Sequence, residues 1–251
     1  MTTPALETRD LNKTFGALNA TTNVNFRLEP GARHALIGPN GAGKTTFINL
    51  LTGVLQPSRG DVILHGESII GLKRERRVRK GLVRTFQINQ LFAGLTVIES
   101  LALVISERSG RGWNWLRPTH AVAGIEREIA ALLKDFGLDG VGDEKCLALP
   151  YGKQRLLEIA LAIACRPRVL LLDEPAAGVP EADRKEVMQH ISRLSSDVSI
   201  LLIEHDMDLV FNFANRISVL VAGALFAEGS VDQIARDQRV KEVYLGGAAH
   251  G

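Results

Sequence analysis

The pattern of apolar and polar residues along the chain predicts strands and helices in alternation. Residues 5–26 form short β-like pieces separated by Asn, Gly and Lys, which is typical of antiparallel strands. The apolar run 34–37 predicts a buried strand before a glycine-rich loop, and residues 46–51 have helical character. Residues 60–66, bounded by glycines, and residues 82–86 predict two more strands. We therefore expect the first third of the chain to be rich in strands.

The middle of the chain is predicted to be helical. Thr96 and Glu99 have capping-box spacing at the start of an apolar helix. A segment rich in Gly, Arg and Trp follows at 106–119, and a further helix is predicted over 125–136. The last third mixes both types, with strands predicted at 169–172, 199–203, 217–221 and 224–227, a helix at 181–194 and a final helix capped by Ser230. The first of these strands is entirely apolar, as in a central parallel strand.

The composition narrows the class of protein. The chain has 251 residues, 45% of them apolar, enough to bury a sizeable core. Its 30 basic and 28 acidic residues give a net charge of +2, which does not indicate nucleic acid as a partner. Cys146 and Cys165 have neither metal-ligand nor redox-pair spacing, so we expect both to pack as small apolar residues in a reducing compartment. No secretory pattern or membrane-length apolar run is visible, and we expect a soluble cytoplasmic chain.

The segment 38–45 reads Gly-Pro-Asn-Gly-Ala-Gly-Lys-Thr between a predicted strand and a predicted helix. Glycines let consecutive backbone N–H groups point at phosphate oxygens, and a helix N-terminus adds its positive dipole end. Lys44 is placed to reach the β- and γ-phosphates, and the Thr45 hydroxyl to bind Mg²⁺. A tight turn with incidental glycines is the alternative. The predicted nucleotide contacts are Gly38, Pro39, Asn40, Gly41, Ala42, Gly43, Lys44, Thr45 and Thr46.

Two later strands end in polar residues. Asp173 and Glu174 follow the apolar run 169–172, and the carboxyl ends of parallel strands open onto the ligand crevice. Asp173 is placed to contact the Mg²⁺ shell, and Glu174 to polarise a water that attacks the γ-phosphate. His205 ends the next strand, where it can hydrogen-bond the γ-phosphate, although a lone histidine is usually structural. The alternative for the carboxylates is a strand that ends in solvated acids.

Together these features predict an α/β fold. A P-loop NTPase core carries an N-terminal antiparallel β-subdomain and an inserted helical subdomain. We expect one domain over residues 1–251, with the nucleotide-binding core at 1–87 and 166–251 and the helical subdomain at 88–165.

In this order the motifs resemble those of the ATP-binding subunit of an ABC transporter over nearly the full length of the chain. Beyond the phosphate loop, the carboxylate strand and His205, the matching pieces are Phe86-Gln87 as the Q-loop, Phe15 as the aromatic residue that stacks on adenine, and 149–155 as the family signature. The resemblance implies ATP hydrolysis with Mg²⁺ at a dimer interface. It makes Glu174, His205 and Gln87 catalytic, and it assigns the metal to Thr45, Gln87 and Asp173. It places Tyr151, Gly152 and Lys153 on the nucleotide of the facing subunit.

The same resemblance implies the partners and the location. These are transmembrane permease subunits, a second ATPase subunit in a homo- or heterodimer and, for an importer, a periplasmic or extracellular substrate-binding protein. Nucleic acid is not among them. The chain is then expected at the cytoplasmic face of the cell membrane, held there peripherally by the permease. The transported substrate cannot be read from this chain, and import rather than export rests on the family resemblance alone.

Within the family, several strings are similar to the branched-chain amino acid importer group, and to the longer of its two ATPases. They are 84–87 (RTFQ), Tyr151-Gly152, 173–178 (DEPAAG), 204–207 (EHDM) and 243–246 (VYLG). The lipopolysaccharide-export ATPase shares Gly178-Val179 and 244–246 and is the rival interpretation, against which stand the EHDM string and Tyr151.

The chain departs from the family pattern at three positions. Pro150 replaces the signature serine, Lys153 replaces the signature glutamine, and Pro180 replaces the aspartate after the carboxylate strand. Proline donates no hydrogen bond, so one contact to the facing nucleotide is lost, although proline fits a helix start. We expect communication between subunits, rather than nucleotide binding, to differ, with slow hydrolysis or an unlike partner ATPase.

Two features of the sequence each allow two interpretations. The basic run 73–80 is interpreted as a solvated helix face, with contact to an anionic membrane as the alternative. Trp113 and Trp115 indicate packing or a partner contact.

Two other classes of protein fit the sequence less well. A soluble ABC-type ATPase acting on ribosomes or DNA usually has two phosphate loops or a long coiled coil, and the chain has neither. A P-loop kinase has no use for the signature helix or for Glu174.

Overall fold

The computed structural model describes residues 2–85, 91–110 and 119–246, and the chain folds into two compact units. Unit 1 comprises Met1–Arg84, Arg168–Glu174 and Ser195–Gly251, and unit 2 comprises Thr85–Pro167 and Pro175–Leu194. The segment Pro175–Leu194, which the sequence assigns to the nucleotide-binding core, groups with the helical unit because its helix packs against a helix of that unit.

Unit 1 contains an antiparallel sheet near the N-terminus, as expected. Its strands are β1 (Leu6–Phe15), β2 (Leu18–Val24), β3 (Arg27–Leu28), β5 (Arg59–Leu64) and β6 (Glu67–Ser68). The order is β2-β1-β5-β6, and β3 also pairs with β1. A residue alternation typical of one buried face appears along β1, where Leu6, Thr8 and Leu11 are buried.

A second sheet of unit 1 holds the parallel strands. They are β4 (Arg33–Ile37), β7 (Leu82–Arg84), β8 (Val169–Asp173), β9 (Ser199–Ile203) and β10 (Arg216–Val221), with β11 (Ala224–Gly229) antiparallel to β10. The order is β11-β10-β4-β9-β8-β7. Every residue of β8 and β9 is buried, which explains their unbroken apolar sequences. This order brings the carboxyl ends of β4, β9 and β8 together at one edge.

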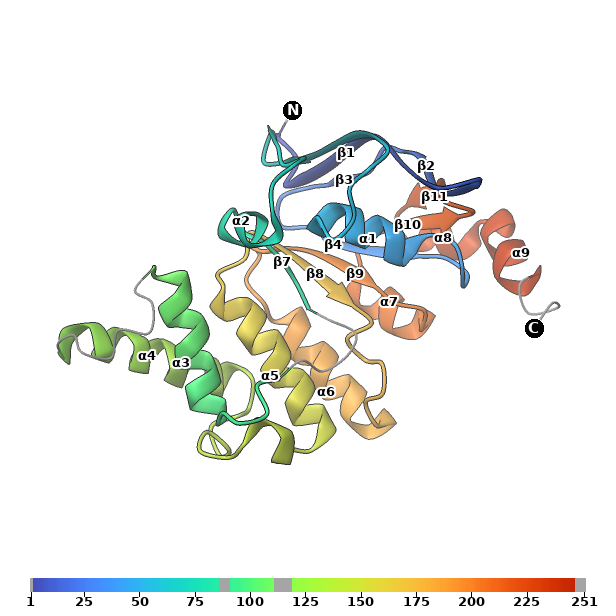
Figure 1. Cartoon of the computed structure of the whole chain (residues 1–251). Coiled ribbons are helices and arrows are strands. Elements are labelled where there is room, and N and C mark those ends of the chain that lie inside the picture. Colours follow the sequence, from blue (N-terminus) through green and yellow to red (C-terminus); the bar gives the residue numbers. More distant parts are fainter. Residues whose placement is uncertain (1, 86–90, 111–118, 247–251) are drawn as a thin grey trace. The chain divides into compact units, whose positions relative to one another are not determined.

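Helix α1 (Lys44–Thr52) lies between the two sheets (Figure 1). Its buried side chains Phe47, Ile48, Leu50 and Leu51 share one apolar cluster with residues from both sheets. The Phe26 ring contacts the Phe47 ring edge-on, with centroids 5.6 Å apart. Burial on two sides fixes α1 and, with it, the glycine loop that precedes it. The other helices of unit 1 are α2 (Arg74–Arg79), α7 (Met207–Phe213), α8 (Val231–Arg236) and α9 (Gln238–Gly246).

Unit 2 is built from helices (Figure 1). They are α3 (Val97–Arg108), α4 (Thr119–Asp135), α5 (Tyr151–Ala164) and α6 (Glu181–Ser192), with a short 3-10 turn at Cys146–Ala148. The predicted capping box is confirmed, because the Thr96 side chain accepts from Glu99 N and the Glu99 carboxylate accepts from Thr96 N. Cys146 is buried as expected, whereas Cys165 is half-buried and burial raises the pKa of its thiol.

Several predicted bounds were wrong. The helix expected at 125–136 begins earlier, at Thr119. The single final helix is two helices, α8 and α9, because the chain breaks at Asp237 after the capping box of Ser230. Helix α7 was not predicted, although Asp206 caps its N-terminus by accepting from the N–H groups of Asp208 and Leu209.

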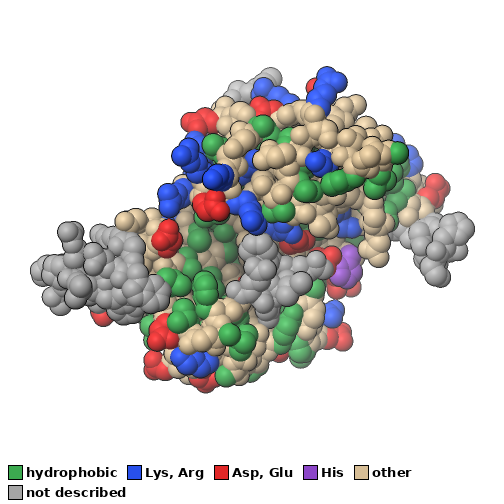
Figure 2. Space-filling view, viewed as in Figure 1, with side chains coloured by type: hydrophobic (Ala, Val, Ile, Leu, Met, Phe, Trp, Pro, Cys, Tyr) green, Lys and Arg blue, Asp and Glu red, His purple; other side chains and the backbone are tan. Residues whose placement is uncertain are grey.

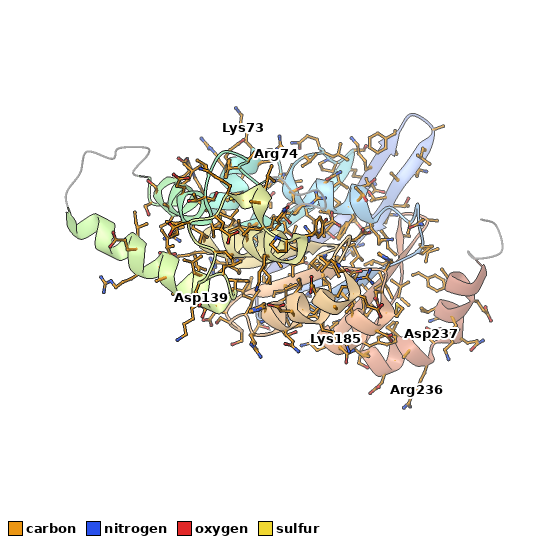
Figure 3. All side chains as sticks on the ribbon, turned by 90° about the horizontal axis from the view of Figure 1, so that it is seen from below. Lys73, Arg74, Asp139, Lys185, Arg236 and Asp237 are labelled. Atoms are coloured by element: carbon orange, nitrogen blue, oxygen red, sulfur yellow. The ribbon has the colours of Figure 1, made fainter. Side chains whose placement is uncertain are left out.

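The basic segment 73–80 forms α2, and one of its cations is not solvated. Arg77 is 1% exposed, and its Nη1 donates to the carbonyl oxygens of Leu50 (3.0 Å) and Leu51 (2.6 Å) in the last turn of α1. A cation at this end of a helix satisfies carbonyl groups that have no intrahelical partner. Lys73 and Arg74 point away from the body of unit 1 (Figure 3), and basic side chains gather on the face over α2 (Figure 2). A uniformly solvated face is therefore the wrong interpretation for Arg77.

We expect Arg77→Ala to lower the free energy of unfolding by about 2–4 kcal/mol, because buried carbonyl acceptors lose a charged donor and a cavity forms. Arg76→Ala, on the same helix but exposed, is the matched control and should change little. Urea unfolding of both variants measures the difference. Equal stability of the two would contradict the role of Arg77 as a buried cap of α1.

Candidate nucleotide-binding site

The glycine loop between β4 and α1 forms a tight cradle. Gly38, Gly41 and Gly43 all have positive φ, and Gly43 is the N-cap of α1 with φ 100°. A Cβ on Gly43 would lie 2.5 Å from the Ala20 carbonyl oxygen, so only glycine fits this close approach. At the N-terminus of α1 the loop therefore offers backbone groups, rather than side chains, to a ligand, as phosphate binding requires.

Lys44 is the first residue of α1, and its ammonium group bends back over the loop. Its Nζ donates to the carbonyl oxygens of Gly38 (2.5 Å) and Pro39 (3.0 Å). Burial lowers the pKa of the Lys44 ammonium, while the negative charges of Glu174 and Asp173 act in the opposite direction. The cation thus lies in the field of both carboxylates, and it is held where an anionic ligand on the loop would meet it. Thr45 and Thr46 follow in the first turn of the helix.

The carboxylates and the histidine meet beyond the ends of β8 and β9. Asp173 is the last residue of β8, is 6% exposed and pairs in register with Ile203 of β9. Nδ1 of His205 lies 3.9 Å from Oε1 of Glu174. The sequence did not single out Glu204, which is buried, accepts from the His205 N–H at 2.9 Å and lies 3.5 Å from His205 Nδ1. The predicted residues of this edge are therefore gathered in one place.

Glu174 has an unusual backbone. Its φ of 45° is in the left-handed region, which a residue with a side chain adopts at a cost. Its N–H donates to the Ile203 carbonyl oxygen at 2.9 Å, so the turn is held by the neighbouring strand. Strain of this kind clusters at functional sites, where it aims a side chain. Here it turns the Glu174 carboxylate, 23% exposed, towards His205.

Asp173 has a partner that the sequence analysis did not identify. Arg84, at the end of β7, donates from Nη2 to Oδ2 of Asp173 at 2.5 Å and from Nη1 to Oδ1 of Asn49 at 2.7 Å. Arg84 meets Asp173 because β7 pairs with β8. This pairing cannot be read from the sequence, so no sequence signal indicated the contact.

Phe15 lies at the end of β1, with 46% of its surface exposed. The ammonium group of Lys13 lies 5.0 Å from the centre of its ring. A large aromatic side chain left this exposed is available for stacking on a flat ring. The geometry is compatible with the predicted contact to adenine.

The signature segment lies in unit 2. Pro150 is the N-cap of α5 without a side-chain cap, and the helix begins at Tyr151. Tyr151 is 38% exposed, whereas Gly152 is buried close to the Asp183 carboxylate. Nζ of Lys153 donates to the Gly137 carbonyl oxygen (3.0 Å) and to Glu186 (3.2 Å). Lys153 is thus engaged inside unit 2, and Tyr151 is the more accessible of the predicted contacts.

The donor set fits a Mg²⁺ ion held together with nucleotide. Among the described residues, no group of three His, Cys, Asp or Glu side chains is arranged to bind a metal. Mg²⁺ usually keeps several waters and takes only one or two protein carboxylates with substrate phosphates. The Thr45 hydroxyl and the Asp173 carboxylate are donors of this kind. Gln87, the third predicted metal residue, lies outside the described residues, as do Phe86, Trp113 and Trp115.

Comparison with known families agrees with this geometry. Residues 21–177 match the family model described as ABC transporter, more than half of the chain. The chain belongs to the ABC transporter ATP-binding family. This ABC ATPase also matches, over residues 224–250, a model described as branched-chain amino acid ATP-binding cassette transporter. The predicted α/β P-loop fold and the predicted ATPase activity are confirmed.

Curated relatives match the ABC ATPase from end to end. The high-affinity branched-chain amino acid transport ATP-binding protein BraF of Pseudomonas aeruginosa is 40% identical over 257 residues, covering 99% of this chain and 100% of the relative. LivG of Escherichia coli strain K12, with the same description, is 39% identical over 255 residues with the same coverage. The resemblance to the branched-chain amino acid group is therefore confirmed.

A solved structure has the same fold. The ADP conformation of MJ1267, an ATP-binding cassette of an ABC transporter, superposes with a TM-score of 0.84 at 29% identity, covering 98% of this chain and all of that one. Of the helices in the described part of this ABC ATPase, none has the length and apolar character needed to cross a bilayer.

Proposed function

We propose that this ABC ATPase powers the import of branched-chain or other hydrophobic amino acids. The observation that carries the proposal is the end-to-end match, at 40% and 39% identity, to two ATP-binding proteins described as serving high-affinity branched-chain amino acid transport. The match of residues 224–250 to a model of that same group supports it at the C-terminus. A lipopolysaccharide-export role is the rival, and it lacks this support.

In the proposed mechanism, the glycine loop and the N-terminus of α1 hold the triphosphate of ATP. Lys44 exchanges the carbonyl groups of Gly38 and Pro39 for the β- and γ-phosphates, which gives its ammonium stronger, charged acceptors. Thr45 and Asp173, with Gln87, would hold the Mg²⁺, which would supply charge neutralisation at the phosphates. Phe15 stacks on adenine.

Glu174 and His205 act on the water and the γ-phosphate. Glu174 accepts a hydrogen bond from the attacking water and takes its proton as the water oxygen bonds to the γ-phosphorus. The bond between the γ-phosphorus and the β,γ-bridging oxygen breaks, and ADP leaves with that oxygen. His205, whose backbone N–H donates to the buried Glu204 carboxylate, keeps the water and the γ-phosphate in line with Glu174. Catalysis of this kind depends mainly on positioning and on charge stabilisation.

We infer that a second ATPase subunit completes each site with residues from its own signature helix. In this chain the corresponding residues are Tyr151, Gly152 and Lys153 at the start of α5, which would contact the nucleotide of the facing subunit. Pro150 has no hydroxyl group, so it adds no hydrogen bond to that contact. The second subunit is a copy of this chain or a related ATPase. Further partners are permease subunits, which hold the chain at the cytoplasmic face of the membrane, and an external substrate-binding protein.

Two measurements test this function. The purified chain, alone or with its partner ATPase, should release free phosphate from ATP without any acceptor; phosphate appearing only on an added metabolite would instead indicate a kinase. The assembled transporter in vesicles should accumulate leucine or valine in the presence of ATP. Co-purification with lipopolysaccharide-export components, and no amino acid uptake, would contradict the import role.

Phe15→Ala should weaken ATP binding by about 1–2 kcal/mol, because an aromatic contact to adenine is lost while the phosphate contacts remain. Calorimetric titration with ATP and with inorganic triphosphate separates the two contributions. Triphosphate affinity should stay unchanged and serves as the internal control. Equal ATP affinity in the variant and the parent would reassign Phe15 to packing.

A further inference from the structure

Arg84 joins two elements that carry predicted metal-binding residues. Its guanidinium donates to Oδ2 of Asp173 on β8 and to Oδ1 of Asn49 on α1, at 2.5 and 2.7 Å. The side chains of Arg84 and Asp173 are 12% and 8% exposed. A guanidinium is planar with donors in fixed directions, so one group that satisfies both acceptors also fixes their relative position.

Asn49 places one end of this bridge beside the phosphate loop. It lies four residues after Thr45 in α1, so the two side chains are on the same face, one turn apart. Thr45 carries the predicted metal-binding hydroxyl, and Asp173 the predicted metal-binding carboxylate. Arg84 therefore connects the helix of one donor to the strand of the other, entirely within unit 1.

The bridge leaves Asp173 able to serve the metal. An ionised carboxylate has two oxygens and about four lone-pair positions, and Arg84 uses Oδ2 alone in the contacts described above. Oδ1 and the second lone pair of Oδ2 are the acceptor positions that could serve a Mg²⁺ ion or its water. Groups that hydrogen-bond a metal-binding carboxylate orient it, and their loss typically lowers metal affinity about 10–100-fold.

We propose that Arg84, anchored by Asn49, is a positioning residue for the Mg²⁺ that accompanies ATP. It holds Asp173 and the Thr45-bearing helix in the spacing that the ion requires. The proposal rests on the proposed nucleotide site and deepens it, because it names the residues that set metal affinity without touching the metal or the nucleotide.

The test uses the full-length chain with Mn²⁺ as the probe and a non-hydrolysable ATP analogue. Arg84→Lys keeps the charge but cannot hold both acceptors with a rigid fork, and Asn49→Ala keeps the buried ion pair but removes its anchor. We expect Mn²⁺ affinity, measured by electron paramagnetic resonance, to fall about 10–100-fold in both variants. Analogue binding in EDTA should change little, because the phosphate loop is intact.

A kinetic readout separates positioning from a general structural loss. The Mg²⁺ concentration for half-maximal hydrolysis should rise in both variants, while kcat at saturating Mg²⁺ stays near that of the parent. The matched control is Arg216→Gln, which removes another arginine–carboxylate pair of unit 1, 2.6 Å from Glu228, and should leave Mn²⁺ affinity unchanged. Asn49→Ala keeps the test available if Arg84→Lys does not fold.

Two results would overturn the proposal. Unchanged Mn²⁺ affinity in both variants would mean that the bridge is only structural. Tighter Mn²⁺ binding would mean that Arg84 competes with the ion for Asp173 instead of presenting it. If the parent chain itself fails to bind Mn²⁺ with the analogue, the proposed nucleotide site fails, and with it the proposal.

Discussion

Glu174→Gln is expected to slow ATP turnover by orders of magnitude while ATP still binds. Glutamine keeps the size of the side chain and its hydrogen-bonding oxygen, but it cannot take a proton from the attacking water. Loss of a general base typically costs about 10²–10⁴-fold in rate. Because the γ-phosphate is then not cleaved, we also expect the variant to accumulate as an ATP-bound pair of subunits.

Phosphate release and light scattering measure the two parts of this expectation. Glu75→Gln, an exposed carboxylate on α2, is the control and should hydrolyse ATP at the parental rate. A variant at Glu174 that retains the parental hydrolysis rate would remove this residue from the reaction. A monomer in ATP, even beside the natural partner subunits, would contradict the shared-site model.

Lys44→Ala is expected to abolish ATP binding. The ammonium group lies over the glycine loop and is held there by backbone carbonyl oxygens that phosphates would replace. Each charged hydrogen bond contributes about 1.5–3 kcal/mol, so the loss of two corresponds to an affinity drop of at least about 100-fold.

Calorimetry with ATP measures this loss, and Lys73→Ala, at the exposed N-cap residue of α2, is the control. The thermal stability of Lys44→Ala should stay close to that of the parent, because the side chain packs on the loop and not in the core. Retained ATP affinity would be incompatible with the assignment of the phosphate loop.

The sequence predicted the elements and residues whose signals are local. The glycine loop, the capping box at Thr96 and the buried strand before Asp173 each follow from a few neighbouring residues, and the structure has all three. The α/β class followed from their order. Local signals suffice here because turn geometry, capping and burial are decided within about one turn of helix or one strand.

The contacts that need strand order could not be predicted. Arg84 meets Asp173 because β7 lies beside β8, and Arg77 is buried because α2 packs on the end of α1. Arg77 stands in a basic segment, where a solvated side chain is the usual outcome, and Arg84 stands in a short apolar strand with nothing nearby in the sequence to indicate its partner. Long-range packing, which no local pattern encodes, determines the burial of Arg77 and the partner of Arg84.

The left-handed backbone at Glu174 costs stability at the same position that supplies the carboxylate. Glycine adopts this φ without strain, so a Glu174→Gly chain is expected to be at least as heat-resistant as the parent while it loses its chemistry.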